Sequence, residues 1–379
     1  MTPKIMIISG EASGDLHGGK LIKALHELAP DLEIFGVGGD DMKKAGMELY
    51  YHVNDLAYVG FVEVLRHYPF FRRVFHHLLQ VVRERRPDLV VLIDYPGFNL
   101  RFAKQVKRLG QDVFYFIAPQ VWAWGTGRAK KMSGFIDHLA VIFEFEVPFF
   151  EQAGVKASFV GHPLRDGMAI HSTREAFFEK YQLSLDRPLF AIFPGSRKQE
   201  IVSLLPVLLQ AAEKLCHRHP DLQVAISQAP TIEMQFFQKV CASHPSFKVV
   251  RDTRYELMKY ATAAAVASGT ATLEVAYWQT PLVIVYKVSA FSYWLAKRLI
   301  KIKHIGLANV VAGYQVASEI IQSDFNVDNV MHRMEPLLFD AGERKNAIAQ
   351  LSAIPAKLGN PGASHRTAVL ILEMLRRSV

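Results

Sequence analysis

The chain has 379 residues, of which 50% are apolar and 21% charged, with a net charge of +8. This length predicts two domains, and the composition excludes long disordered segments. The two cysteines, Cys216 and Cys241, have neither disulfide nor metal-site spacing, which favours a reducing, cytoplasmic setting. No apolar run reaches the roughly 18 residues that span a bilayer, so we expect a soluble or peripheral protein.

Short apolar runs alternate with helical patterns in the first half, which is typical of a parallel sheet wrapped by helices. The expected strands are Ile5–Ser9, Glu33–Val37, Leu89–Asp94, Val113–Ala118, Leu139–Phe143 and Ser158–Gly161. Helical periodicity is clearest in Leu21–Leu28 and Val74–Arg86. The segment Gly161–Asp166 predicts the exit from a first domain.

A second series of strands follows that exit. Its expected strands are Leu189–Phe193, Leu222–Ser227, Lys248–Val250, Ala264–Ala267 and Leu282–Tyr286. From Val327 onward the pattern is helical, with a break at Leu358–Gly362. We therefore predict two doubly wound, Rossmann-like α/β domains facing a cleft, at 1–165 and 166–345, with C-terminal helices at 346–379 packing back towards the first domain.

Two turns, one in each half, combine small residues with hydroxyls where a strand ends and a helix begins. They are Ser9–Asp15 and Ser268–Glu274. Such turns present backbone N–H groups to anions such as phosphate, so a sugar-nucleotide transferase is the first class to test. The first turn does not match the GxGxxG dinucleotide pattern. Glu274 suits two vicinal ribose hydroxyls, or simply a carboxylate near a helix start.

The segment Phe193–Ile201 places positive charge at another strand end. Gly195 lets the backbone approach a ligand, Ser196 suits a helix cap, and Arg197 suits the stabilisation of a departing diphosphate. The alternative is an ordinary helix cap with cations in solvent.

A further strand end carries Asp94 and Asn99, with Glu11 and Asp15 expected at the neighbouring strand end. A transfer that inverts at an anomeric carbon needs a base on the acceptor hydroxyl, and one of these carboxylates suits that role. Each also suits a cap or turn, which is the favoured interpretation for Asp15. No HExxH pattern occurs among the 15 histidines, and His217 and His219 flank a turn, so we expect no metal site.

Two stretches mix cations with apolar residues, Arg66–Arg86 and Tyr293–Lys303. They suit contact with an anionic membrane surface, or equally amphipathic helices whose apolar faces lie in the core. No motif for nucleic-acid binding accompanies them, so we expect no nucleic-acid partner. Trp122 and Trp124 suit either a groove for acyl chains or a sugar ring, or the core.

Eight motifs occur in a fixed order: SGEASGD, DLAYVGFVEVLRH, PQVWAW, VGHPLRD, PGSRKQEI, ASGTATLE, YWLAKRLIK and LANVVAG. In this order the chain resembles the lipid-A-disaccharide synthase family of GT-B glycosyltransferases, from Ile5 to Gly362–Ala368. The resemblance implies an inverting transfer from UDP-2,3-diacylglucosamine to 2,3-diacylglucosamine 1-phosphate. The products would be the β-1,6-linked lipid A disaccharide 1-phosphate and UDP, formed without a cofactor or metal.

The same resemblance implies a cytoplasmic enzyme, peripheral on the inner membrane of Gram-negative bacteria, and permits a homodimer. It assigns an essential arginine and asparagine to Arg197 and Asn309. With the strand-end candidates, the expected catalytic residues are Asp94, Arg197, Asn309 and Glu11. The expected substrate-binding residues are Ser13, Gly14, Asp15, Asn99, Gly195, Ser196, Ser268, Gly269, Thr270, Thr272 and Glu274.

The chain departs from the family pattern at Gly97, where many members have an aspartate, so Asp94 or Glu11 is left as the base. Gly125 replaces a common arginine, and Tyr314-Gln315 replaces a charged pair. Two alternatives remain at this point. One is a GT-B-like enzyme acting on a soluble UDP-sugar, such as an epimerase. The other is a non-catalytic relative that binds lipid or nucleotide.

Overall fold

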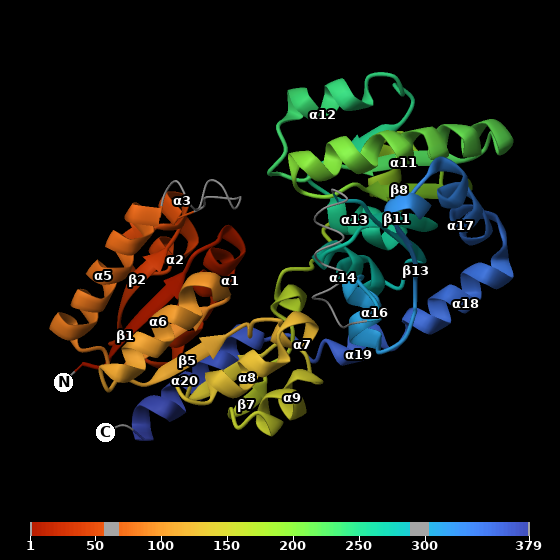
Figure 1. The fold of residues 1–379 in the computed structure, drawn as a ribbon. Coiled ribbons are helices and arrows are strands. Elements are labelled where there is room, and N and C mark those ends of the chain that lie inside the picture. Colours follow the sequence, from red (N-terminus) through yellow and green to blue (C-terminus); the bar gives the residue numbers. More distant parts are fainter. Residues whose placement is uncertain (1, 57–67, 289–302, 378–379) are drawn as a thin grey trace. The chain divides into compact units, whose positions relative to one another are not determined.

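The computed structural model describes residues 2–56, 68–288 and 303–377, which form two compact units (Figure 1). The first unit contains the residues up to Asp166 together with those from Leu358 onward, and the second contains Gly167–Lys357. The return to the first unit thus begins at Leu358, later than the expected position 346. Each unit is built around one parallel sheet with helices on both faces.

In the described part of the first unit, seven parallel strands lie in the order β3-β2-β1-β4-β5-β6-β7. They are β1 (Lys4–Ser9), β2 (Glu33–Gly38), β3 (Glu48–His52), β4 (Leu89–Ile93), β5 (Val113–Phe116), β6 (His138–Val141) and β7 (Ala157–Phe159). Every residue of β4 and β5 is buried, as expected for a parallel sheet covered on both faces. The strand order reverses between β1 and β4, where ligands bind in such folds.

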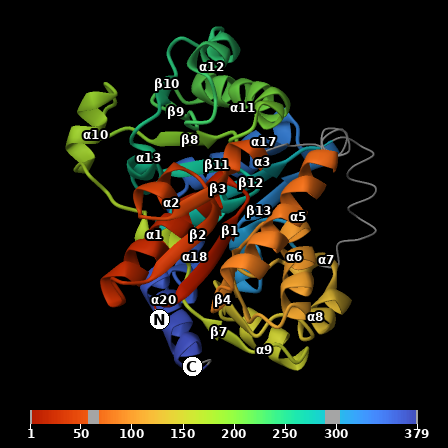
Figure 2. The same cartoon turned by 90° about the vertical axis from the view of Figure 1, so that its left-hand side faces the viewer.

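The helices of this unit form two layers. They are α1 (Ala12–Leu28), α2 (Asp40–Lys44), α3 (Val53–Leu56), α5 (Tyr68–Arg85), α6 (Pro96–Arg108), α7 (Val121–Trp124), α8 (Thr126–Met132), α9 (Glu146–Gln152) and α20 (Ala363–Arg377). Figure 2 shows β1 and β2 between α1 and α2 on one side and α5 and α6 on the other. Alternate strand residues form one apolar core with α5, α6, α8 and α9, while α20 packs against α1.

In the described part of the second unit, six parallel strands lie in the order β10-β9-β8-β11-β12-β13. They are β8 (Leu189–Phe193), β9 (Gln223–Ser227), β10 (Lys248–Val250), β11 (Ala263–Ala267), β12 (Leu282–Tyr286) and β13 (Ser318–Ile321). The sequence missed β3 and β13, because each is a short edge strand that is only partly buried and lacks a clear apolar run.

The helices of the second unit also form two layers. They are α10 (Arg174–Lys180), α11 (Lys198–Arg218), α12 (Met234–Cys241), α13 (Arg254–Tyr260), α14 (Thr270–Tyr277), α16 (Leu307–Ala312), α17 (Val327–Phe339), α18 (Ala341–Leu351) and α19 (Ile354–Lys357). Helices α11, α12 and α17 share an apolar core with one sheet face. Helix α14 contacts both α13 and α16, and none of these three helices contributes to that core.

The outgoing and returning chain segments of the first unit are bonded together. The Arg366 guanidinium donates to the carbonyls of Val160 and Asn360, at 2.8 and 2.5 Å. The Asp166 carboxylate accepts from the Gly362 amide at 2.6 Å. Figure 1 shows the resulting arrangement, with the blue α20 lying among the yellow and orange elements of this unit. This connection accounts for Asp166 in the motif VGHPLRD and for Arg366 in the segment Gly362–Ala368.

In its described part, the first basic stretch, Arg66–Arg86, is an amphipathic helix whose apolar face lies in the core. Along α5, Val74, Leu78 and Val82 are buried in the core, whereas Arg72 and Arg73 are exposed. Most of the second stretch lies outside the described residues. Among the residues that the structure does describe, no helix is long and apolar enough to cross a bilayer.

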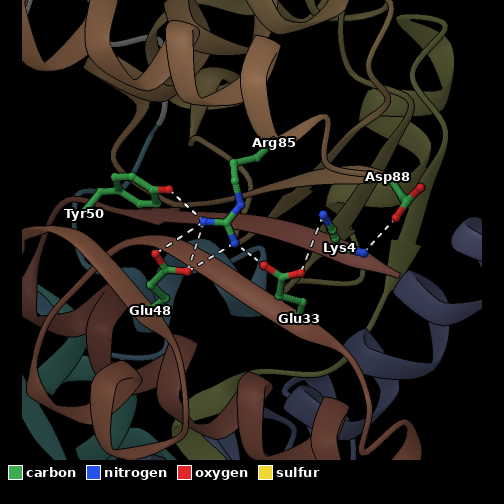
Figure 3. Close-up of polar contacts among 6 residues, drawn as sticks. All are labelled: Lys4, Glu33, Glu48, Tyr50, Arg85 and Asp88. Carbon is green, nitrogen blue, oxygen red and sulfur yellow. Dashed lines mark hydrogen bonds and ion pairs between the residues drawn. The ribbon is translucent and has the colours of Figure 1, made fainter. Parts of the chain in front are cut away.

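A charged network joins the amino-terminal ends of strands in the first sheet (Figure 3). The guanidinium of Arg85 donates to the carboxylates of Glu33 and Glu48 and, at 2.8 Å, to the Tyr50 hydroxyl. It also lies 4.4 Å from the centre of the Phe35 ring. One cation therefore connects α5 to β2 and β3 at the edge of the sheet.

We predict that Arg85→Ala lowers the free energy of unfolding by about 1–2 kcal/mol, because both carboxylates and the ring contact lose their partner. Arg83→Ala, an exposed cation on the same helix, should cost less than about 0.5 kcal/mol. Urea unfolding of both variants measures the difference. Equal stability of the two variants would show that the network contributes nothing.

Candidate functional site

The acceptor-side candidates of the first unit come from neighbouring strands at the reversal of strand order. Ser9 at the end of β1 is paired with Ile93 at the end of β4. Glu11 and Ser13 follow the first strand and are exposed, and Asp94 follows the second and is half-buried. The predicted proximity of Glu11 and Asp94 is therefore present, since their charges interact.

The sequence predicted Asp94 as the last residue of a strand. In the structure β4 ends at Ile93, and Asp94 begins the constrained turn that follows. Asp94 and Tyr95 both have left-handed backbones, with φ values of 45° and 50°. The carbonyl of Asp94 accepts from the Asn99 amide at 2.8 Å and from the Tyr115 hydroxyl. A Cβ at Gly10 would overlap the Tyr95 ring, so this close contact requires glycine. Strained backbone fixed from several sides is common at functional sites.

The electrostatics of Asp94 suit a proton acceptor. Burial and the nearby Glu11 charge raise the pKa of Asp94 to about 6, against a partial opposing effect of the Tyr95 amide. A carboxylate with this pKa is ionised at neutral pH yet holds a proton better than an ordinary aspartate. Asn99, by contrast, is fully buried and bonds to the Ile93 and Asp94 carbonyls. Its role is to hold the turn.

Two other acceptor-side candidates have structural roles in the described unit. The Asp15 carboxylate is buried and accepts from the amides of Gly39, Asp41 and Met42, at 2.6 to 3.1 Å, where α2 begins. This agrees with the capping interpretation. Gly14 is buried against the Ser9 side chain.

Gly97, the departure from the family pattern, lies in open space at the start of α6. It is exposed, and a Cβ at this position would meet no atom within 4 Å. The aspartate of other family members would therefore fit there without any rearrangement of the turn.

The nucleotide-side candidates of the second unit also come from neighbouring strands. Phe193 at the end of β8 is paired with Val266 near the end of β11. The turns that follow, at 195–197 and 268–270, therefore lie at the same edge of the second sheet. The Arg197 side chain is 76% exposed, and it forms a 3.5 Å ion pair with Glu200.

Glu200, to which the sequence assigned no role, occupies the first of these turns. Its Oε2 accepts from the amides of Ser196 and Arg197, at 2.8 and 3.2 Å. A Cβ at Gly195 would overlap this oxygen. The N-cap is thus Arg197 rather than the expected Ser196, the Glu200 carboxylate at the third helical position completes a capping box, and Gly195 makes room for that carboxylate. The spacing of Arg197 and Glu200, cap and third helical residue, is the signal that identifies it.

The second turn, at the start of α14, is open. Gly269 and Thr270 are exposed, and no side chain caps the helix. The hydroxyl of Thr272 donates to the Gly269 carbonyl at 2.8 Å, and that of Ser268 to the Ile305 carbonyl at 3.1 Å. These two hydroxyls therefore shape the turn, and its exposed residues remain for a ligand.

Glu274 lies one turn further along α14 and is buried. Its carboxylate contacts Arg254 and Tyr255 at the start of α13, two residues that the sequence did not single out. The signal that could have found Arg254 is its position, because a cation in the first turn of a helix is unfavourable without an outside partner.

Asn309 has no hydrogen-bonding capacity left for a substrate. Its amide oxygen accepts from the Val316 and Ala317 amides, and its nitrogen donates to the Ala317 carbonyl and to Glu319. Glu319 in turn accepts from the amides of Ile305 and Gly306. Asn309 is fully buried, so we assign it a positioning role in place of the catalytic one expected from the sequence.

The tryptophan loop is fixed by a buried acid. The Trp122 indole donates at 2.9 Å to Glu146, which also accepts from two backbone amides. Burial raises the pKa of Glu146 to about 7, against these three bonds. The side chain of Trp124 lies outside the described part. In that part, no three His, Cys, Asp or Glu side chains are grouped as a metal site.

A family model described as lipid-A-disaccharide synthetase matches residues 5–371. The chain belongs to this family. Family relatives include the lipid-A-disaccharide synthase of Geobacter sulfurreducens, 42% identical over 377 residues that cover 99% of this chain and 98% of the relative. That of Coxiella burnetii is 38% identical over 371 residues, covering 98% of each chain. The resemblance drawn from the ordered motifs is confirmed.

Two solved structures with the same fold carry the names of other enzymes. The calicheamicin glycosyltransferase CalG4 has a TM-score of 0.62 at 15% identity, with 99% of both chains covered. The UDP-GlcNAc 2-epimerase of Neisseria meningitidis, solved with UDP-GlcNAc bound, has a TM-score of 0.60 at 12% identity, with 100% of both covered. At these identities the likeness shows the fold alone, and it confirms the predicted GT-B class.

We predict that Asn309→Ala lowers the free energy of unfolding by about 3 kcal/mol, because four hydrogen bonds to Val316, Ala317 and Glu319 are lost. UDP affinity should fall with it, since the segment beside Ser268 loosens. Asn329→Ala, an exposed asparagine of α17, is the control and should change both by little. Full stability with complete loss of turnover would instead indicate that Asn309 contacts substrate.

Proposed function

We propose that this chain transfers a diacylated glucosamine from its UDP donor to 2,3-diacylglucosamine 1-phosphate, with inversion at the anomeric carbon. The products are the β-1,6-linked disaccharide 1-phosphate and UDP. The observation that carries the proposal is the family match over residues 5–371. The acceptor-side carboxylates of the first unit and the open turn of the second supply the chemical groups that the reaction needs.

In the proposed reaction Asp94 is the general base. It takes the proton of the acceptor 6-hydroxyl as the oxygen attacks the anomeric carbon, while the bond to UDP breaks. Its pKa of about 6 supports this role. Glu11 contributes by raising that pKa, and Asn99 and Tyr115 contribute by holding the Asp94 backbone.

The departing diphosphate gains negative charge, and the second unit offers two groups for it. The exposed guanidinium of Arg197 would pair with that charge, and the open start of α14 at Gly269 and Thr270 would donate backbone amides. The amides of Ser196 and Arg197 are already bonded to Glu200. We therefore assign the contribution of the first turn to the Arg197 side chain and not to its backbone.

The alternatives are less well supported. A UDP-sugar epimerase rests on a likeness of 12% identity, which shows the fold alone, whereas the synthase relatives are about 40% identical over nearly the full length. A non-catalytic relative was suggested by Gly97. The Asp94–Glu11 pair offers a base without it, so Gly97 is no obstacle to activity.

We also propose that the enzyme acts as a peripheral protein on the cytoplasmic face of the inner membrane, where both lipid substrates lie. Because the apolar face of α5 is in the core, this helix would meet anionic headgroups only through exposed cations such as Arg72 and Arg73. A homodimer remains a prediction.

The decisive assay uses mixed micelles of UDP-2,3-diacylglucosamine and 2,3-diacylglucosamine 1-phosphate, with the disaccharide followed by mass spectrometry. We expect disaccharide and UDP in equal amounts, and a loss of about 100-fold or more in Arg197→Ala. Arg187→Ala, at a surface ion pair with Asp221, should retain activity. UDP release without disaccharide would contradict the proposed reaction. Unchanged turnover in Arg197→Ala would contradict the role assigned to Arg197.

The pH profile tests the base. The ionised form of Asp94 is the active one, so kcat/KM should fall as the pH drops through about 6, the pKa of this group. Asp94→Asn should lose about 100-fold or more in turnover. Glu11→Gln removes the like charge, so its acid limb should move to lower pH. An acid limb that stays in place in Glu11→Gln would argue against Asp94 as the titrating base.

A further inference from the structure

Glu274 holds its two carboxylate oxygens in different surroundings. Its Oε1 accepts from Arg254 Nη2 and from the Tyr255 hydroxyl, both at 3.2 Å. Its Oε2 has no hydrogen-bond partner in the described part of the chain. The residue remains 7% exposed, so the second oxygen keeps its full capacity to accept bonds from a ligand that reaches the start of α14.

Arg254 and Tyr255 form a unit of their own around the first oxygen. The two side chains are bonded to each other at 2.5 Å, and the guanidinium carbon lies 4.6 Å from the centre of the Tyr255 ring. Both begin α13, where the helix itself favours an anion over a cation. The cost of placing Arg254 there is offset by its pairing with Glu274 across to α14.

The pair also acts on the charge of Glu274. Burial raises the pKa of this carboxyl, and Arg254 and Tyr255 oppose the rise. An ionised carboxylate accepts hydrogen bonds from hydroxyl groups, whereas a protonated one is a poorer acceptor and carries a donor of its own. Arg254 and Tyr255 therefore favour the ionised form, which is the form that binds a diol.

We propose that Arg254 and Tyr255 are positioning residues for the nucleotide, occupying Oε1 of Glu274 so that Oε2 accepts the ribose hydroxyls. They act through Glu274 and touch no reacting atom. The inference rests on the proposed function, because it takes a uridine nucleotide as the ligand at the start of α14. It adds two residues that set affinity through the sugar of that nucleotide.

The experiment compares UDP with 2′,3′-dideoxy-UDP by calorimetry, because only UDP has the two hydroxyls. Wild type should bind UDP about tenfold more tightly than the dideoxy compound. In Arg254→Gln the affinity for UDP should fall about tenfold, and that for dideoxy-UDP less than about twofold. Arg254→Lys keeps the charge, so its affinity for UDP should lie between those of wild type and Arg254→Gln. A merely structural role would lower both affinities equally.

Two further variants keep the test decisive. Tyr255→Phe retains the ring and removes only the hydroxyl, so it tests the inference if Arg254→Gln does not fold. We expect this variant to lose affinity for UDP and to keep its affinity for dideoxy-UDP. Arg174→Gln is the matched control, since Arg174 also lies over an aromatic ring, at 4.5 Å from Phe178, and donates one bond to a carbonyl. It should change neither affinity.

Equal losses for the two nucleotides in Arg254→Gln and Tyr255→Phe, or a wild type without preference for UDP, would overturn the inference. The outcome is separate from that of the proposed function, which depends on the lipid substrates. A wild type that prefers UDP over its dideoxy analogue but forms no disaccharide would contradict the proposed reaction and leave the positioning role intact.

Discussion

The amide groups at helix starts are the constraint on which both sites depend. Each start leaves N–H groups without a partner inside the helix, so a side chain, water or a ligand must supply one. The chain fills several starts with its own carboxylates, as with Asp15 at α2, Glu200 at α11 and Glu319 at α16. Within the described part of the chain, the starts of α1 and α14 are among those that have no side-chain cap. They follow central strands of the two sheets, where an anionic ligand fits best.

Asp94 and Glu274 show how neighbouring charges decide what a carboxylate can do. Asp94 has Glu11 beside it, so burial and a like charge act in the same direction and favour the protonated form. Glu274 has Arg254 beside it, so an opposite charge works against burial. The first arrangement suits a group that accepts a proton during a reaction. In the second, Arg254 favours the charged form, which accepts hydrogen bonds from hydroxyls, so the same side-chain chemistry suits two tasks.

The sequence predicted most of the central strands because a strand covered on both faces is a continuous apolar run, as in β4 and β8. It could not predict β3 or β13, whose side chains are partly exposed at an edge. At the sites it placed Arg197, Asp94 and the α14 turn from local pattern. It could not assign roles that depend on distant partners. The hydrogen-bonding groups of Asn309 are all occupied by the 316–319 segment. Arg254 reaches Glu274 only because α13 and α14 are neighbours.

The boundary at Leu358 shows the same limit at the level of a unit. Between 341 and 357 the pattern is helical, and a helical pattern alone does not show which unit the helices pack against. The polar break at 358–362 was visible, but its meaning comes from partners almost 200 residues earlier in the chain. There the Leu358 carbonyl accepts from the His162 amide at 2.8 Å, and Asp166 accepts from Gly362. The place where the chain leaves the first unit and returns to it is thus defined by hydrogen bonds between the outgoing and returning segments. These bonds satisfy backbone groups that neither segment can satisfy alone.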